Sequence, residues 1–204
     1  MSTKQTQTTP SSHTYNEDIL VVPRTILFQS TSAWQGIRHD IFDVFVHNIE
    51  QNACYIPRAK AETDPSYKQI IPYLVFKHKN TFFVMQRKAT ASEQRLANKF
   101  SLGIGGHIRQ DDISNNNIFD WAKREFEEEV SYNGNIKISN LGVLNDDSSD
   151  VGKVHLGMVL LLEGDSDQIS IKDEHKSGTL LTLEECKALN PRMETWSKII
   201  LEIL

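Results

Sequence analysis

Hydrophobic positions along the chain follow two periods, one typical of strands and one typical of helices. Two runs rich in β-branched and aromatic residues, 70–76 and 81–85, flank the polar residues 77–80. This arrangement predicts an antiparallel hairpin. Pro72 cannot donate a backbone hydrogen bond, so we expect its strand to lie at a sheet edge or to be irregular near its start.

Further elements are predicted on both sides of this hairpin. Apolar runs at 19–22 and 154–162 predict strands, and the apolar spacing over 37–49 predicts a helix. A helix is also expected from about Ile118 to Val130, with Asn133-Gly134 supplying a left-handed stop. Two short helices should follow, one from a capping box over 182–185 and an amphipathic one over 196–204.

Strands and helices are mixed without regular βαβ alternation, which predicts an α+β sandwich. With 204 residues and 39% hydrophobic content, the chain can bury one sizeable core. We expect one domain over residues 17–204, preceded by a disordered polar tail over residues 1–16.

Charge and cysteine content narrow the class of protein. The formal net charge of −5 argues against a nucleic-acid polymer as partner, because such binders carry a basic surface. The longest apolar run, 158–162, is too short to span a bilayer, and the N-terminus lacks the apolar segment of a signal peptide. Cys54 and Cys186 form no Cys-x-x-Cys pair, which fits a reducing compartment. We expect a cytoplasmic protein with no membrane partner, and a homodimer is left open.

The most informative segment is the glutamate-rich part of the 118–130 helix. Glu125, Glu128 and Glu129 share one helix face at i, i+3 and i+4, beside an apolar face that includes Phe119 and Phe126. Such a run is ordinarily a solvated surface. The upstream Gly105-Gly106 changes this interpretation, because glycines let a backbone approach a ligand closely. A hard divalent cation would offset the repulsion among the carboxylates.

These residues resemble the Nudix box, whose signature is Gly-x5-Glu-x7-Arg-Glu-(apolar)-x-Glu-Glu-x-Gly-(apolar). The matching text here reads Gly106-x5-Asp112-x11-Arg124-Glu125-Phe126-x-Glu128-Glu129-x-Ser131-Tyr132. The wider text is similar to a prokaryotic branch of predicted phosphoesterases, over roughly residues 18–204. Asp112 replaces the first box glutamate, four extra residues precede Arg124, and Ser131 replaces the last glycine.

The resemblance implies an α/β/α sandwich with a mixed sheet and a metal site on its strand–loop–helix segment. Glu125, Glu128 and Glu129 would be Mg²⁺ or Mn²⁺ ligands, with the carbonyl of Gly106 as a further ligand. Arg124 would orient a box glutamate. The implied reaction is attack of water on a phosphorus of a small-molecule diphosphate, namely a nucleoside diphosphate linked to another group. Glu128, Glu129 and Arg124 would belong to the catalytic machinery.

Other residues are candidates for the base and for substrate binding. Glu174 lies in the polar loop 172–178, where some Nudix hydrolases carry a general base; its alternative is a solvated loop acid. Four basic side chains are predicted to contact substrate phosphates, although they could also be ordinary surface residues. They are Arg87, Lys88, Arg95 and Lys99. His107 and His155 could contact substrate, or each could be a structural histidine.

Three alternative interpretations are considered beside the hydrolase, namely a sensor module, an isomerase and a calcium site. A nucleotide-binding or sensor module with the same fold and little catalysis is favoured by the altered loop around Asp112 and opposed by the intact glutamates. An isomerase of isopentenyl diphosphate shares the fold and uses a cysteine, but Cys54 lacks that enzyme's motif. The acidic stretch 146–152 is predicted to be a turn, because position twelve counted from Asp147 is Met158 and not the acid that a calcium loop requires.

Overall fold

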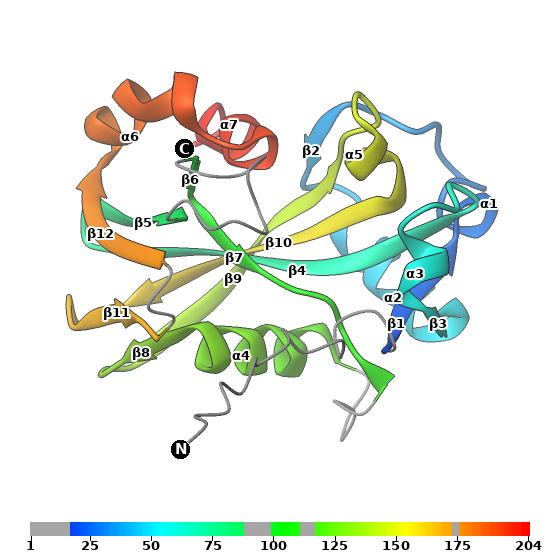
Figure 1. The fold of residues 1–204 in the computed structure, drawn as a ribbon, viewed down its shortest axis with the longest axis horizontal. Helices are drawn as coiled ribbons and strands as arrows, with labels where there is room; N and C mark the ends of the chain where they lie inside the picture. The colour runs from blue at the N-terminus through cyan, green and yellow to red at the C-terminus, as the bar shows by residue number, and fades with distance from the viewer. Residues whose placement is uncertain (1–16, 88–98, 111–116, 173–175) are drawn as a thin grey trace, which may run out of the picture.

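The computed structural model describes residues 17–87, 99–110, 117–172 and 176–204 (Figure 1). The tail predicted for residues 1–16 lies outside these ranges. The strands are β1 (Asp18–Pro23), β2 (Gly36–Arg38), β3 (Cys54–Pro57), β4 (Tyr67–His78), β5 (Thr81–Arg87), β6 (Phe100–Ser101), β7 (Gly103–Gly105), β8 (Val130–Tyr132), β9 (Ile136–Asn145), β10 (His155–Gly164), β11 (Ile169–Ile171) and β12 (Lys176–Thr182). The helices are α1 (Arg24–Leu27), α2 (Phe42–Asn52), α3 (Arg58–Ala61), α4 (Ile118–Glu129), α5 (Asp150–Val154), α6 (Leu183–Leu189) and α7 (Thr195–Leu201), with a 3-10 turn, η3 (Asn190–Arg192).

A mixed sheet in the order β12-β5-β4-β10-β9-β2 forms the middle of the molecule. Its central pair, β4 and β10, is parallel and sets His155 opposite Gln69, whereas the neighbouring pairs are antiparallel. Strands β1 and β7 pair with the remaining edge of β4, and β8 and β11 form a small separate sheet. The predicted α+β fold with a mixed sheet is therefore confirmed. Among the described residues, no helix is long and apolar enough to cross a membrane.

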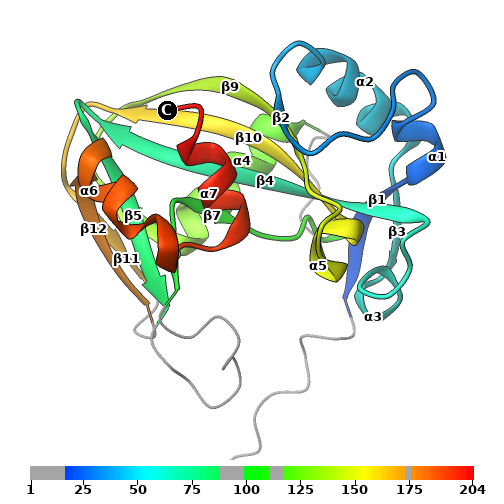
Figure 2. The ribbon, with the colours of Figure 1, turned by 90° about the horizontal axis from the view of Figure 1, so that it is seen from above.

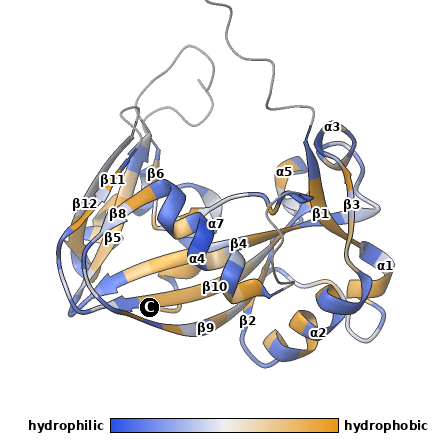
Figure 3. Cartoon of the chain, turned by 90° about the horizontal axis from the view of Figure 1, so that it is seen from below, coloured by the Kyte–Doolittle hydropathy of each residue, from blue (hydrophilic) through white to orange (hydrophobic). Residues whose placement is uncertain are grey.

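Helices cover both faces of the sheet, so successive residues of β4 enter different cores. Leu74 and Phe76 pack toward α4, whereas Tyr73 and Val75 pack toward α6 and α7. Figures 1 and 2 show α4 on one side of the sheet and α6 and α7 on the other. Apolar residues are concentrated along the central strands (Figure 3). This alternation follows from the two-residue period of a strand covered on both faces.

The predicted hairpin is confirmed, since β4 and β5 pair antiparallel at its turn, with Lys77 opposite Phe82. Of the two alternatives for Pro72, the edge strand was wrong, because β4 is central, and the pairing of β4 is instead irregular around this residue. On one side β4 pairs with β1 through residues 67–69 and with β7 through residues 73–75. Pro72 falls between these stretches, so its missing N–H is accommodated where the partner strand changes.

Two boundary predictions were wrong. The helix predicted over 37–49 begins only at Phe42, because Ile37 lies in β2 and pairs with Leu144 of β9. Helix α4 ends at Glu129, where Val130 turns directly into an extended strand, so Asn133-Gly134 does not stop it. The C-terminal helices are confirmed, and Thr182 and Glu185 form the predicted capping box of α6.

A buried lysine ties the central strands to α5. The side chain of Lys68 in β4 is fully buried, and its Nζ donates to Asp147 at 2.8 Å and to the carbonyls of Gly152 at 2.8 Å and His155 at 3.1 Å. Arg24 pairs with the same carboxylate. The carboxylate of Asp147 is therefore paired with two cationic side chains of the protein, and the turn predicted over 146–152 gives way to α5 at Asp150.

Candidate active site

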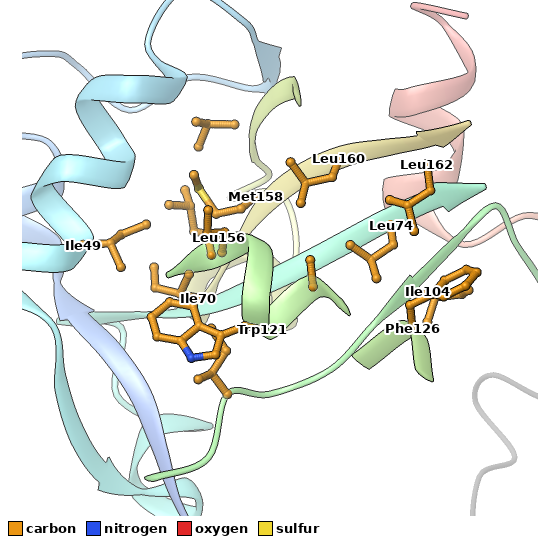
Figure 4. Close-up of a cluster of buried hydrophobic side chains, with 14 of the residues drawn as sticks. Ile49, Ile70, Leu74, Ile104, Trp121, Phe126, Leu156, Met158, Leu160 and Leu162 are labelled. Carbon is orange, nitrogen blue, oxygen red and sulfur yellow. The ribbon is translucent and has the colours of Figure 1, made fainter. Parts of the chain in front are cut away.

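Helix α4 positions the glutamates through an apolar stripe on its inner side. Asn117 caps the helix by accepting a hydrogen bond from the backbone N–H of Phe119 at 2.9 Å. The buried side chains recur at the i, i+3, i+4 spacing of an amphipathic helix, namely Ile118, Trp121, Ala122, Glu125 and Phe126. Figure 4 shows Trp121 and Phe126 within the cluster that joins α4 to the sheet.

One detail of the predicted helix face was wrong. Phe119 is 40% exposed, and Trp121 occupies the core in its place with 3% exposure. Burying an aromatic side chain of this size contributes on the order of 2–3 kcal/mol. The apolar stripe therefore fixes the rotation of α4 and, with it, the direction of Glu125.

Glu125 is the charged member of this inner stripe and lies directly against Gly106. It is only 7% exposed, and a Cβ built on Gly106 would lie 2.3 Å from its Oε1 and 2.5 Å from its Oε2. The carboxylate thus fits against the glycine backbone only because that residue has no side chain. A carboxylate this deep needs cationic or hydrogen-bonding partners. The guanidinium of Arg124, 3.9 Å away, is one of them.

Arg124 connects the helix to the loop that follows β7. Its Nη1 donates to Glu128 Oε1 at 2.9 Å, one helical turn ahead, and its Nη2 donates to the carbonyl of His107 at 3.3 Å. Arg109 reaches the same Glu128 carboxylate from the loop at 3.2 Å. These contacts join the box helix to the loop that follows β7.

The three predicted metal ligands differ in exposure. Glu125 is buried, Glu129 is partly buried, and the side chain of Glu128 is 48% exposed. All three offer carboxylate oxygens, and that of Glu125 lies beside the backbone of Gly106; hard oxygen donors are what Mg²⁺ and Mn²⁺ prefer. The residues present therefore fit such an ion. Glu127 points elsewhere, toward Lys123 at 3.9 Å.

Several other predicted site residues cannot be placed. Lys88, Arg95, Asp112 and Glu174 lie outside the described residues, so the predicted base and two of the predicted phosphate contacts stay predictions. Arg87 ends β5, and Lys99 is exposed just before β6. Their contact with substrate likewise stays a prediction.

His107 lies beside the box and is mostly buried, with 16% of its side chain exposed. Its Nε2 is 2.7 Å from Gln69 Oε1 and 3.4 Å from Nε2 of His155. Burial, with the positive charge of Arg58 nearby, lowers the pKa of His107 to about 3. If it contacts substrate, it does so as a neutral hydrogen-bonding group. Sequence reasoning missed its neighbours Gln69 and Glu62, since no motif spacing links them to the box.

The cysteines show no sign of catalytic activation. Cys54 is exposed in β3, where it lies opposite Val21 of β1. Cys186 is buried against the α6 side of the sheet, where burial raises the pKa of its thiol to about 11. A thiol with a raised pKa is a poor nucleophile.

Comparison with known proteins agrees with this geometry. No family model matches the chain. Protein YmaB of Bacillus subtilis (strain 168) is 36% identical, over 93% of this chain and 98% of YmaB. The crystal structure of Tm1382, described as a candidate Nudix hydrolase, is 30% identical and superposes with a TM-score of 0.79 over 92% of this chain and 97% of Tm1382.

More distant structures share the fold alone. The NUDIX domain of Shewanella oneidensis NrtR, solved with ADP ribose, is 11% identical, with a TM-score of 0.51 over 67% of this chain and 84% of that domain. The extent and identity of the Tm1382 match, together with the glycine–glutamate contact on the box helix, settle the family. The chain belongs to the Nudix hydrolases.

Proposed function

We propose that this protein is a metal-dependent hydrolase that cleaves the phosphoanhydride bond of a nucleoside diphosphate linked to another group. The contact between the Glu125 carboxylate and Gly106 carries the proposal. It supports a preformed oxygen-ligand site at the end of β7, within a chain of the Nudix family. The substrate in this proposal is a small, soluble molecule that contains a diphosphate.

In this proposal the helix glutamates hold Mg²⁺ or Mn²⁺. Glu125, Glu128 and Glu129 supply carboxylate oxygens, and the carbonyl of Gly106 is a further ligand. When bound, the metal lowers the pKa of water and neutralises charge that develops on the phosphate oxygens. Arg124 keeps Glu128 and the glycine loop in register, and Glu174 accepts the proton of the attacking water.

A second candidate function rests on the contacts of Glu128. Its carboxylate is engaged by both Arg109 and Arg124. Two guanidinium groups compete with a metal ion for the same oxygens, which is the arrangement expected of a nucleotide-binding or sensor module with little catalysis. In the hydrolase, Arg109 would have to release Glu128 when metal and substrate bind.

A substrate screen separates these functions. ADP ribose, nucleotide sugars, dinucleoside polyphosphates, nucleoside triphosphates and coenzymes are incubated with Mg²⁺ or Mn²⁺ and then with a phosphatase that releases phosphate from the products. Turnover in ¹⁸O-labelled water, followed by mass or phosphorus spectra of the products, identifies the attacked phosphorus. The hydrolase requires ¹⁸O on a product phosphate and loss of activity with a chelator.

Two variants of the same helix then test the metal ligands. Glu128→Gln removes one charge from the predicted ligand set and should lower kcat at least about a hundredfold, equivalent to about 2.7 kcal/mol of barrier, with weaker Mg²⁺ or Mn²⁺ binding by calorimetry. Glu127→Gln is the matched control and should stay within about twofold. Equal metal affinity in wild type and Glu128→Gln would remove the metal-site assignment. Nucleotide binding without turnover on any substrate would favour the sensor module.

A further inference from the structure

A second group of metal-type ligands lies beside the box but shares no side chain with it. Glu62 follows α3, His107 follows the glycines of the box, and His155 begins β10. One ligand atom from each lies within 4.8 Å of the other two. The group is assembled by the sheet, because the parallel pairing of β4 and β10 sets His155 opposite Gln69, the hydrogen-bond partner of His107.

The spacing of these atoms matches a four-coordinate ion. The two imidazole Nε2 atoms are 3.4 Å apart, and His107 Nε2 is 3.7 Å from Glu62 Oε1. A tetrahedral ion with metal–nitrogen bonds of about 2.0–2.1 Å places two nitrogen ligands about 3.4 Å apart. The distance from His107 Nε2 to Glu62 Oε1 is a few tenths of an ångström longer than this, so the carboxylate would have to move closer to complete three protein ligands.

The hydrogen bond at Nδ1 leaves the required lone pair on Nε2 of His155, whereas His107 Nε2 must give up its 2.7 Å hydrogen bond to Gln69 Oε1 before it can bind an ion. The Nδ1 atom of His155 lies 2.7 Å from the carbonyl of Val151, which can only accept, so Nδ1 carries the proton and Nε2 presents its lone pair to the cluster. A backbone carbonyl in this position is the usual outer partner of a metal-bound imidazole.

The surrounding charges leave Glu62 as the anion of the cluster. Arg58 contacts Glu62 at 3.4 Å but also pairs with Glu17 at 2.6 Å, and the buried Lys68 is paired with Asp147. The amide Nε2 of Gln69 is buried and has no hydrogen-bond partner among the described residues. An unpaired polar group of this kind, in a 0% exposed residue beside His107, indicates an incomplete polar site.

We propose that Glu62, His107 and His155 bind a late first-row transition metal ion, with Zn²⁺ as the best match, and leave its fourth position to water. Two imidazoles and one carboxylate form a borderline ligand set, which suits Zn²⁺ and Co²⁺ better than the hard Mg²⁺ or Mn²⁺ of the box. The site is reached from the side of Glu62, whose side chain is 34% exposed. The ion would brace α3, the glycine loop and β10 against one another.

The test uses the full chain, stripped of metal with a chelator. Zn²⁺ affinity is measured by competition with a chromophoric chelator, and Co²⁺ serves as a spectroscopic probe because four-coordinate Co²⁺ absorbs far more strongly in the visible range than six-coordinate Co²⁺. The variants are His107→Gln and Glu62→Gln, which preserve size and hydrogen-bonding ability. Controls are His47→Gln, an exposed histidine of α2, and Glu128→Gln of the box.

Wild type, His47→Gln and Glu128→Gln should each bind one Zn²⁺ and show the strong Co²⁺ bands. His107→Gln and Glu62→Gln should bind Zn²⁺ at least about tenfold more weakly, since loss of even an outer-shell partner costs that much. They should also lose the rise in Tm that Zn²⁺ gives the wild type. Equal Zn²⁺ affinity in wild type and both variants overturns the proposal. So does a Co²⁺ site that Glu128→Gln abolishes, or an X-ray absorption spectrum of the Zn²⁺ form without imidazole.

Discussion

Replacing Gly106 by alanine tests the contact on which the active-site argument rests. The new Cβ would lie 2.3 Å from Glu125 Oε1, whereas ordinary van der Waals contact begins at 3.4 Å, so the carboxylate must move by about 1 Å. Because Glu125 is packed in the inner stripe of α4, this movement should cost about 1–3 kcal/mol of folding free energy, the usual range for overpacking. A metal ligand displaced by about 1 Å should also lower kcat by roughly a hundredfold.

The assay is a double-mutant cycle in urea. Gly106→Ala is measured in the wild-type background and in the Glu125→Ala background, where the new methyl group meets no carboxylate. The free-energy cost should fall below about 0.5 kcal/mol in the second background, because the two residues are coupled only through the clash. The same cost in both backgrounds would refute the reasoning, since the destabilisation would then come from the glycine backbone and not from Glu125.

Three further predictions concern stability and the base. Lys68→Met should lower the unfolding free energy by about 3–5 kcal/mol in urea titrations, since it removes the buried donor of two carbonyls and leaves Asp147 with Arg24 alone, while the exposed control Lys153→Met should cost under about 0.5 kcal/mol. Although burial opposes its ionisation, hydrogen bonds from Arg24 and Lys68 lower the pKa of Asp147 to about 2 from 3.8. Its contribution, about 2 kcal/mol, is therefore present above pH 4 and lost as pH falls toward 2; unfolding curves of Asp147→Asn should lack this loss. Glu174→Gln should lower kcat by about 10²- to 10⁴-fold without changing metal affinity, and a kcat within threefold of wild type would make Glu174 a solvated loop acid.

Short-range patterns in the sequence predict those secondary-structure elements that interactions between near neighbours in the chain determine. The hairpin of β4 and β5, the capping box at Thr182 and the existence of α4 follow from short-range signals, and the structure has all three. The side-by-side position of Gly106 and Glu125 was implied by the Nudix box. The physical reason for this contact is that the Glu125 carboxylate occupies the space that a side chain at position 106 would need. That reason follows only from the three-dimensional structure.

Features that depend on distant pairing could not be predicted. Ile37 continues the apolar spacing of α2, yet β9 recruits it into a strand, because tertiary pairing overrides weak local preference. Phe119 and Trp121 both suit a buried face, and only the packing of α4 on the sheet decides between them. Glu62, His107 and His155 are separated by more than forty residues each, so no spacing rule identifies them as a group.

The parallel pairing of β4 with β10 also has a consequence for how this chain folds. Its first contact joins residues 69 and 155, and every strand and helix between them must be looped out before the pair can close. Closing a loop of that length costs conformational entropy before any contact offsets it. Chains whose central pairing is this remote in sequence fold slowly, on a scale of about milliseconds to seconds. During that interval the unpaired edges of the apolar strands β4 and β10 are exposed, which makes both strands prone to aggregation in a nascent or refolding chain.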